Sequence, residues 1–148
     1  MDKILRIAVL GATGKVGSHF VKQSLDKGFS LRVLVRNKSI FECKNKSDVS
    51  IVVGNSTNLK DVEDLITNVD CVVSLLGNVK ADNQYTNIMQ KSHANILKIS
   101  ARKNKIPKCI FISSIGCGGS SWIIKAMLSM VAGKKSFNGY EAADKQVR

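Results

Sequence analysis

The stretch AVLGATGKVG, residues 8–17, follows the apolar run ILRIAVL (4–10) and carries three glycines spaced three residues apart. A turn that leaves a strand and opens a helix gathers free backbone N–H groups at the positive end of the helix dipole. A diphosphate fits there if no side chain keeps it away. Gly11 would permit the tight turn, Gly14 the close approach of the phosphates, and Gly17 the packing of the helix on the sheet.

Three other residues of this turn, Thr13, Lys15 and Val16, would add N–H groups, a hydroxyl and one positive charge. The pattern predicts a nucleotide site because it stands between a predicted strand and an amphipathic helix. The alternative is a tight strand-to-helix turn without a ligand, which explains one glycine better than three.

The rest of the chain alternates between two kinds of segment. Short runs rich in Val and Ile predict strands covered on both faces, at residues 4–10, 31–35, 50–53, 71–76 and 109–113. Helical spacing of apolar residues appears at 15–28, 58–68 and 85–103. Gly28 is expected to stop the first helix, and Asn58 to cap the start of the second.

Alternating strands and helices require a parallel sheet, because parallel neighbours need a crossover, and these crossovers are right-handed. The sequence therefore predicts an α/β fold: an open, doubly wound parallel sheet with three α/β/α layers. For a sheet of this kind that carries the glycine turn after its first strand, we expect the Rossmann strand order 3-2-1-4-5.

Arg36 follows the second predicted strand in the stretch VLVRNKS, with Lys38 nearby and no carboxylate. Sites for NAD usually have an acid there, about twenty residues after the glycines, that binds the ribose hydroxyls. An arginine instead accommodates a 2′-phosphate, which it can grip with two hydrogen bonds. We therefore expect NADP(H) to be preferred over NAD(H); the alternative is that Arg36 is only a surface charge.

The ends of the other strands are expected at the same crevice, since doubly wound sheets bind ligands at the carboxyl ends of their strands. We expect Gly54, Asn55 and Ser56 near the adenine, Leu76, Gly77 and Asn78 near the ribose and diphosphate, and Ser113 and Ser114 near the nicotinamide. For Gly77 and the two last serines, an ordinary role as turn residues is the alternative.

Composition excludes several classes of function. The 148 residues carry a formal net charge of +12, but the basic side chains are spread along the chain, so a nucleic-acid partner is not expected. The cysteines at 43, 71, 109 and 117 have no ligand-like spacing to one another or to a histidine, so no metal site is expected. Cys71 and Cys109 are expected to be buried thiols, and His19 and His93 to be surface residues.

The N-terminus lacks the ordered regions of a signal peptide, and the longest apolar stretch, WIIKAMLSMVAG (122–133), is too short to span a membrane. A cytoplasmic protein is therefore expected. The same stretch would form an apolar wall over the pocket, with Trp122, Ile123, Met127 and Met130 facing it, or else a core or dimer helix.

Four stretches together resemble the atypical short-chain dehydrogenase/reductase family, in particular NmrA-like proteins and flavin reductases of the biliverdin reductase B type. They are KILRIAVLGATGKVGSHFVKQSLDKGFSLRVLVRN, VVGNSTN, DCVVSLLGN and CIFISSIG, and the similarity spans residues 4–116. The resemblance implies a Rossmann fold that binds NADP(H), with GATGKVG on the diphosphate, Arg36 on the 2′-phosphate, and Ser113 or Ser114 near the nicotinamide. Many members have an Asp where this chain has Asn55, the position that touches the adenine.

Dehydrogenases of the wider superfamily use Tyr-x-x-x-Lys, in which the ammonium lowers the pKa of the phenol that acts as general acid. Tyr140 and Lys145 are five residues apart and stand well over a right angle apart on a helix, so we do not expect that pair. The resemblance implies that members reducing planar acceptors do without it, because the cofactor performs the hydride transfer. Ser114 would then orient the nicotinamide or donate a proton, and Tyr140 and Lys145 remain candidates for lining the pocket.

Two functions follow as alternatives. The first is an NADPH-dependent oxidoreductase that transfers hydride to a flavin, quinone or similar planar acceptor. The second is a non-catalytic NADP(H)-sensing regulator of the NmrA type, which reports to a protein partner. We expect residues 1–148 to form a single NAD(P)-binding domain, monomeric or homodimeric, that lacks the C-terminal portion of the substrate site, because the sequence stops within a predicted helix.

Overall fold

A computed structural model describes residues 4–41, 43, 46–77, 88–102, 107–112 and 134–147 of the chain. The strands are β1 (Arg6–Leu10), β2 (Ser30–Val35), β3 (Val49–Val53), β4 (Cys71–Ser74) and β5 (Lys108–Phe111). The helices are α1 (Lys15–Asp26), α2 (Leu59–Leu65), α3 (Ile88–Ser100) and α5 (Lys134–Val147), with 3-10 turns η1 (Lys38–Ile40) and η2 (Lys46–Asp48). The predicted strands and the three predicted helices are confirmed, with ends that differ by a few residues.

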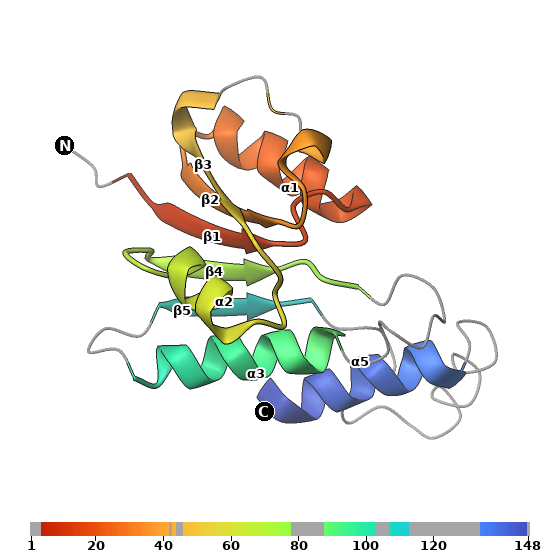
Figure 1. Ribbon diagram of the computed structural model, residues 1–148. Helices are drawn as coiled ribbons and strands as arrows, with labels where there is room; N and C mark the ends of the chain where they lie inside the picture. Colours follow the sequence, from red (N-terminus) through yellow and green to blue (C-terminus); the bar gives the residue numbers. More distant parts are fainter. Residues whose placement is uncertain are drawn as a thin grey trace.

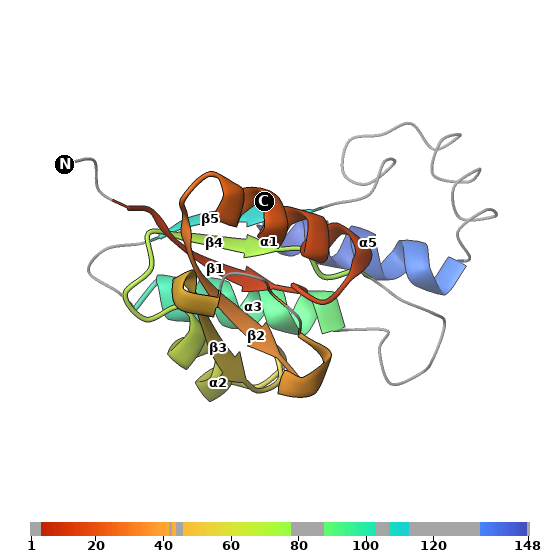
Figure 2. The ribbon, with the colours of Figure 1, turned by 90° about the horizontal axis from the view of Figure 1, so that it is seen from above.

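The strands form one parallel sheet in the order β3-β2-β1-β4-β5 (Figure 1). In the centre, Leu10 of β1 aligns with Leu34 of β2 on one side and with Ser74 of β4 on the other. The predicted Rossmann topology and strand order are confirmed. Figure 2 shows the strands turning progressively across the sheet, as parallel sheets do. The chain builds the sheet outward from β1, first through β2 and β3 and then through β4 and β5. A crevice therefore opens at the carboxyl end of β1, the switch point of the strand order.

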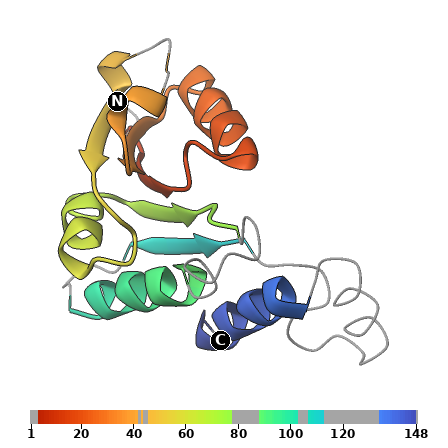
Figure 3. The same ribbon diagram turned by 45° about the vertical axis from the view of Figure 1, so that its right-hand side comes forward.

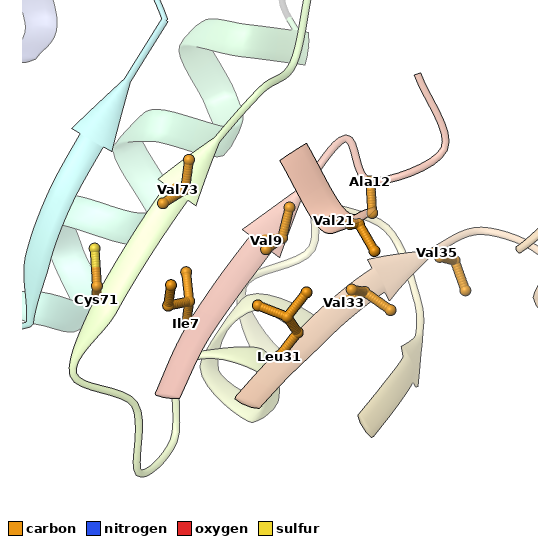
Figure 4. Packing of buried hydrophobic residues seen from close by; sticks show 9 residues of the cluster. All are labelled: Ile7, Val9, Ala12, Val21, Leu31, Val33, Val35, Cys71 and Val73. Atoms are coloured by element: carbon orange, nitrogen blue, oxygen red, sulfur yellow. The ribbon is translucent and has the colours of Figure 1, made fainter. Parts of the chain in front are cut away.

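Two apolar clusters hold the layers together, one on each face of the sheet. On the first face Val21 of α1 packs with strand residues that Figure 4 shows side by side, among them Val9 and Val33. On the second face Leu65 of α2 and Ile96 of α3 join the core. Figure 3 shows α1 on one side of the sheet and α2 and α3 on the other, with α5 against α3.

The central strands β1, β2 and β4 are therefore buried on both faces, which explains their nearly continuous runs of apolar residues. The outer strands β3 and β5 expose residues such as Val53 and Ile110, so the prediction that every strand is covered on both faces is wrong for these two.

The ends of α1 and α2 follow from local chemistry. Gly28, with φ +77°, follows α1 and confirms the predicted stop, since only glycine adopts this conformation at no steric cost. The Asn58 side chain accepts hydrogen bonds from the N–H groups of Lys60 and Asp61, which confirms the predicted cap of α2. At the other end of α2, the Arg32 guanidinium donates to the carbonyls of Asp64 and Leu65. The short α2 is thus capped at both ends.

The predictions for histidine and cysteine side chains meet different outcomes. His19 is exposed, as expected, whereas the expectation that His93 lies at the surface is wrong: its side chain is 1% exposed. The reason is that α3 packs against both the sheet and α5. Polar residues beside its apolar positions, His93 among them, are therefore buried as well. Cys71 is buried as expected, and Cys109 on the outermost strand is half-buried. Burial raises the pKa of both thiols.

Within the part of the chain that the structure describes, every helix is too short or too polar to cross a bilayer.

Candidate functional site

A pocket of about 340 Å³ opens at the carboxyl ends of the four strands β1 to β4. Its walls combine apolar strand ends with glycines and a few polar side chains, which is the usual composition of a small-molecule site. The lining residues are Leu10, Gly11, Thr13, Gly14, Leu34, Val35, Arg36, Gly54, Ser56, Leu75, Leu76, Gly77 and Ile88. The pocket lies at the switch point of the sheet, where doubly wound folds bind their ligands.

The three glycines of the turn between β1 and α1 differ in what a side chain would meet. Gly11 has φ +82°, and a Cβ on it would lie 2.8 Å from the carbonyl oxygen of Leu75. A Cβ on Gly17 would lie 1.9 Å from the carbonyl oxygen of Gly11. Among the described residues, the one neighbour within 4 Å of a Cβ on Gly14 is that same oxygen at 3.4 Å, an ordinary contact distance. The fold therefore excludes side chains at Gly11 and Gly17 but tolerates one at Gly14, which lines the pocket.

The N-terminus of α1 adjoins this pocket and favours an anion. Gly14 is the N-cap residue and has no side chain to cap the first N–H groups, and the first turn contains no acid. Lys15 adds a positive charge and is exposed, as is Val16. Free N–H groups and the helix dipole act in the same direction here, so the charge distribution suits a phosphate.

Arg36 lies one residue beyond β2 and lines the pocket with an exposed side chain. None of the described lining residues is acidic. In the described part of the chain, this end of the pocket therefore carries a guanidinium without a carboxylate, which suits a second phosphate better than a pair of ribose hydroxyls.

The loop after β3 presents Gly54 and Ser56 to the pocket, whereas Asn55 between them is exposed and does not belong to the lining residues. The Asn55 Oδ1 accepts hydrogen bonds from the N–H and the Oγ1 of Thr57, both at 3.0 Å, so the side chain closes a local turn. Ser56 is buried, with 7% of its surface exposed. Sequence reasoning placed Asn55 and Ser56 together near the adenine, but the structure brings only Ser56 to the pocket.

Tyr140 reaches the end of β4 from a distant part of the chain. Its hydroxyl oxygen lies 3.0 Å from the position that a Cβ on Gly77 would take. Lys145, five residues later on α5, is exposed and lies about 140° further round the helix. The structure thus brings Tyr140, and not Lys145, to the edge of the pocket.

Other predicted site residues lie beside the pocket or outside the described part of the chain. Lys15, Val16 and Gly17 belong to the first turn of α1 and lie beside the pocket. Asn78, Ser113 and Ser114 lie outside the described residues, as do Trp122, Ile123, Met127 and Met130.

Five apolar lining residues were missed by sequence reasoning. They are Leu10, Leu34, Val35, Leu75 and Ile88. The first four lie at or just after the ends of strands. Each directly precedes another residue that lines the pocket, and this position could have identified them. No such signal exists for Ile88, because only the packing of α3 against the sheet brings its first residue to the pocket.

Comparison with known proteins agrees with this geometry. Residues 11–148 match the family described as NAD(P)H-binding. Phenylcoumaran benzylic ether reductase PT1 from Pinus taeda is 32% identical over 88 residues, which cover 53% of this chain and 29% of that protein.

Two solved structures show the same fold. Vestitone reductase from alfalfa (Medicago sativa) superimposes with a TM-score of 0.71 at 18% identity, over 96% of this chain and 51% of that one. ChuY, an anaerobillin reductase from Escherichia coli O157:H7, does so with a TM-score of 0.68 at 16% identity, over 96% of this chain and 66% of that one. The chain thus spans only part of the length of these relatives. The family match confirms the resemblance seen in the sequence, and the chain belongs to the NAD(P)H-binding family of Rossmann domains.

Proposed function

We propose that this protein is an NADPH-dependent oxidoreductase that transfers hydride to a planar acceptor such as a flavin or quinone. The observation that carries the proposal is the glycine at position 14, which lines the pocket. The fold would accept a side chain there, yet the sequence leaves the backbone bare. A site that must admit a diphosphate against the backbone explains this glycine, because any side chain would occupy the place of the phosphates.

The remaining lining residues suit the other parts of the same cofactor. The N–H groups at the start of α1 would bind the diphosphate, and Arg36 would pair with a 2′-phosphate and so favour NADP(H) over NAD(H). Gly54 and Ser56 would flank the adenine, while Leu76, Gly77 and Asn78 would lie along the ribose, and Ser113 and Ser114 by the nicotinamide.

When bound, NADPH supplies the hydride, and the chain's task is to orient it and exclude water. Leu75, Leu76 and Ile88 form apolar walls at the β4 side of the pocket that serve this purpose. A proton must accompany the hydride to the acceptor; Ser114 or solvent would donate it. The hydroxyl of Tyr140 lies at Gly77 and would contribute a hydrogen bond to the pocket. It would do so without a lysine four residues later to assist it, since Lys145 is five residues away.

The relatives support a reductase. The pine, alfalfa and Escherichia coli proteins are all reductases by name. We also propose that residues 1–148 form a single NAD(P)-binding domain, acting in the cytoplasm as a monomer or homodimer.

A non-catalytic NADP(H) sensor of the NmrA type is the second candidate function. The exposed position of Lys145 favours it, because Tyr140 and Lys145 then do not form a Tyr–Lys pair at the pocket. A sensor would bind a protein partner in place of an acceptor.

Calorimetric titration of the purified chain with NADPH and separately with NADH tests the cofactor. Tight binding of NADPH with much weaker binding of NADH is expected, and no binding of either would overturn the proposal. Oxidation of bound NADPH on addition of flavin mononucleotide or a soluble quinone then separates the two functions. Turnover supports the enzyme, whereas binding without turnover supports the sensor.

A further inference from the structure

The loop between β3 and α2 forms one wall of the pocket and is tied to its surroundings at both ends. The N–H of Gly54 donates to the carbonyl of Val35 at 2.9 Å, which continues the β2–β3 pairing by one residue. The N–H of Asn58 donates to the carbonyl of Asn55 at 2.9 Å, which closes the turn before α2. The middle of the loop is held by two side chains from other elements.

The first of these is Asp61 of α2. Its Oδ2 accepts a hydrogen bond from the N–H of Asn55 at 2.8 Å, and a Cβ on Gly54 would lie 2.6 Å from the same oxygen. The carboxylate therefore lies against the loop backbone more closely than any side chain at Gly54 would allow. A hydrogen bond to an ionised acceptor is stronger than one between neutral groups.

The second is Asn95, which lies on α3 and is half-buried. Its Nδ2 donates to the carbonyl of Ser56 at 3.2 Å. Asp61 and Asn95 thus hold the neighbouring residues Asn55 and Ser56 from two different helices.

We propose that Asp61 and Asn95 are positioning residues that hold the 54–58 loop as a preformed wall for the adenine. They would act through the loop, because Gly54 and Ser56 line the pocket whereas neither Asp61 nor Asn95 does. A wall ordered before binding avoids the entropy cost of ordering it on binding. This inference rests on the proposed function, since it concerns the adenine half of the same cofactor.

The test compares Asp61→Ala with Asp61→Asn, which keeps an acceptor oxygen for the Asn55 N–H. Glu63→Ala is the matched control, because it removes the same charge from an exposed position of the same helix. The ligands are NADPH, adenosine 2′,5′-bisphosphate and inorganic pyrophosphate, the last of which reaches only the glycine turn. Affinities are measured by calorimetry or competition, and folding by thermal unfolding.

Asp61→Ala should weaken NADPH and the bisphosphate about tenfold, the loss of one charge-assisted hydrogen bond, and leave pyrophosphate unchanged. Asp61→Asn should stay within about threefold of the unmodified protein, since a neutral acceptor replaces a charged one. Unchanged affinity in a folded Asp61→Ala variant, or equal losses for the bisphosphate and pyrophosphate, would overturn the inference.

Asn95→Ala keeps the inference testable if Asp61→Ala does not fold. It removes the donor to Ser56 and should weaken the bisphosphate several-fold without affecting pyrophosphate. Full affinity in this variant would contradict the inference. If the unmodified protein itself fails to bind NADPH, the proposed function has failed instead, so the two failures are distinguishable.

Discussion

The Nε2 atom of His93 lies 3.1 Å from the Oγ of Ser74, and this contact ties α3 to the last residue of β4. The same imidazole packs edge-on against Phe111, the last residue of β5, with ring centroids 4.4 Å apart. Burial lowers the pKa of His93 to about 4. An uncharged histidine therefore joins one helix to two neighbouring strand ends.

This histidine makes the stability of the fold depend on pH. The folded-state pKa lies below the ordinary value of 6.5, so the unfolded chain binds more protons between the two values. Stability should be fully present above pH 6.5 and fall as the pH drops towards 4, by at most about 3 kcal/mol from this residue. Urea unfolding at pH 7 and pH 4.5 measures the loss.

The control pair is His93→Gln and His19→Gln. His93→Gln should be less stable at pH 7 but lose less on acidification, while the exposed His19→Gln should behave like the unmodified protein. Equal acid sensitivity in all three proteins would contradict the assignment of this effect to His93.

Gly17→Ala should destabilise or unfold the protein. Its Cβ would lie 1.9 Å from the carbonyl oxygen of Gly11, and backbone rather than a flexible side chain would have to move. A loss of about 3 kcal/mol or more in the free energy of unfolding is expected, the upper range for overpacking. Gly14→Ala is the matched control and should unfold like the unmodified protein. Similar losses of stability in both variants would contradict the close contact between Gly17 and the Gly11 carbonyl as the cause.

Gly14→Val should abolish binding of both NADPH and NADH while the fold persists. The backbone at Gly14, with φ −75° and ψ 168°, is extended and open to any residue, and a Cβ there makes only an ordinary contact. The valine side chain would take the place of the diphosphate. Calorimetry and thermal unfolding on the same sample check the two halves of this prediction, and undiminished binding would refute the role of the turn.

Arg36→Asp should weaken NADPH by about a hundredfold and NADH far less, because two charge-assisted hydrogen bonds to the 2′-phosphate are lost. Lys22→Asp makes the same change of charge at an exposed position of α1 away from the pocket and should alter neither affinity by much. Titration of each variant with both dinucleotides is the measurement. Equal losses for NADPH and NADH in Arg36→Asp would rule out the 2′-phosphate as its partner.

Tyr140→Phe should lower turnover with a flavin or quinone acceptor by less than about tenfold, the effect of one neutral hydrogen bond. The phenol lies at Gly77, but Lys145 is exposed on another side of α5 and is not placed to assist it. Steady-state kinetics of this variant and of Lys145→Ala are the measurement. A loss of several orders of magnitude in both would restore the Tyr–Lys pair that the spacing argues against.

Features that depend on neighbours in the chain were readable from the sequence. The run of apolar residues before Gly11 predicted β1, the left-handed conformation of Gly28 ended α1, and Asn58 capped α2. The strand order was also predicted correctly, because the glycine turn after the first strand is typical of the Rossmann arrangement. These features rest on backbone sterics and local hydrogen bonds, which a few adjacent residues determine.

Contacts between distant residues were decided only by the tertiary structure. Sequence reasoning placed His93 at the surface, whereas packing buries its imidazole against Ser74. The approach of Tyr140 to Gly77 and of Asp61 to Asn55 also has no signal in the spacing of the residues. The reason is physical: periodicity shows that a face of a helix is buried, but the side chain that a residue meets there depends on how helices and strands pack in three dimensions.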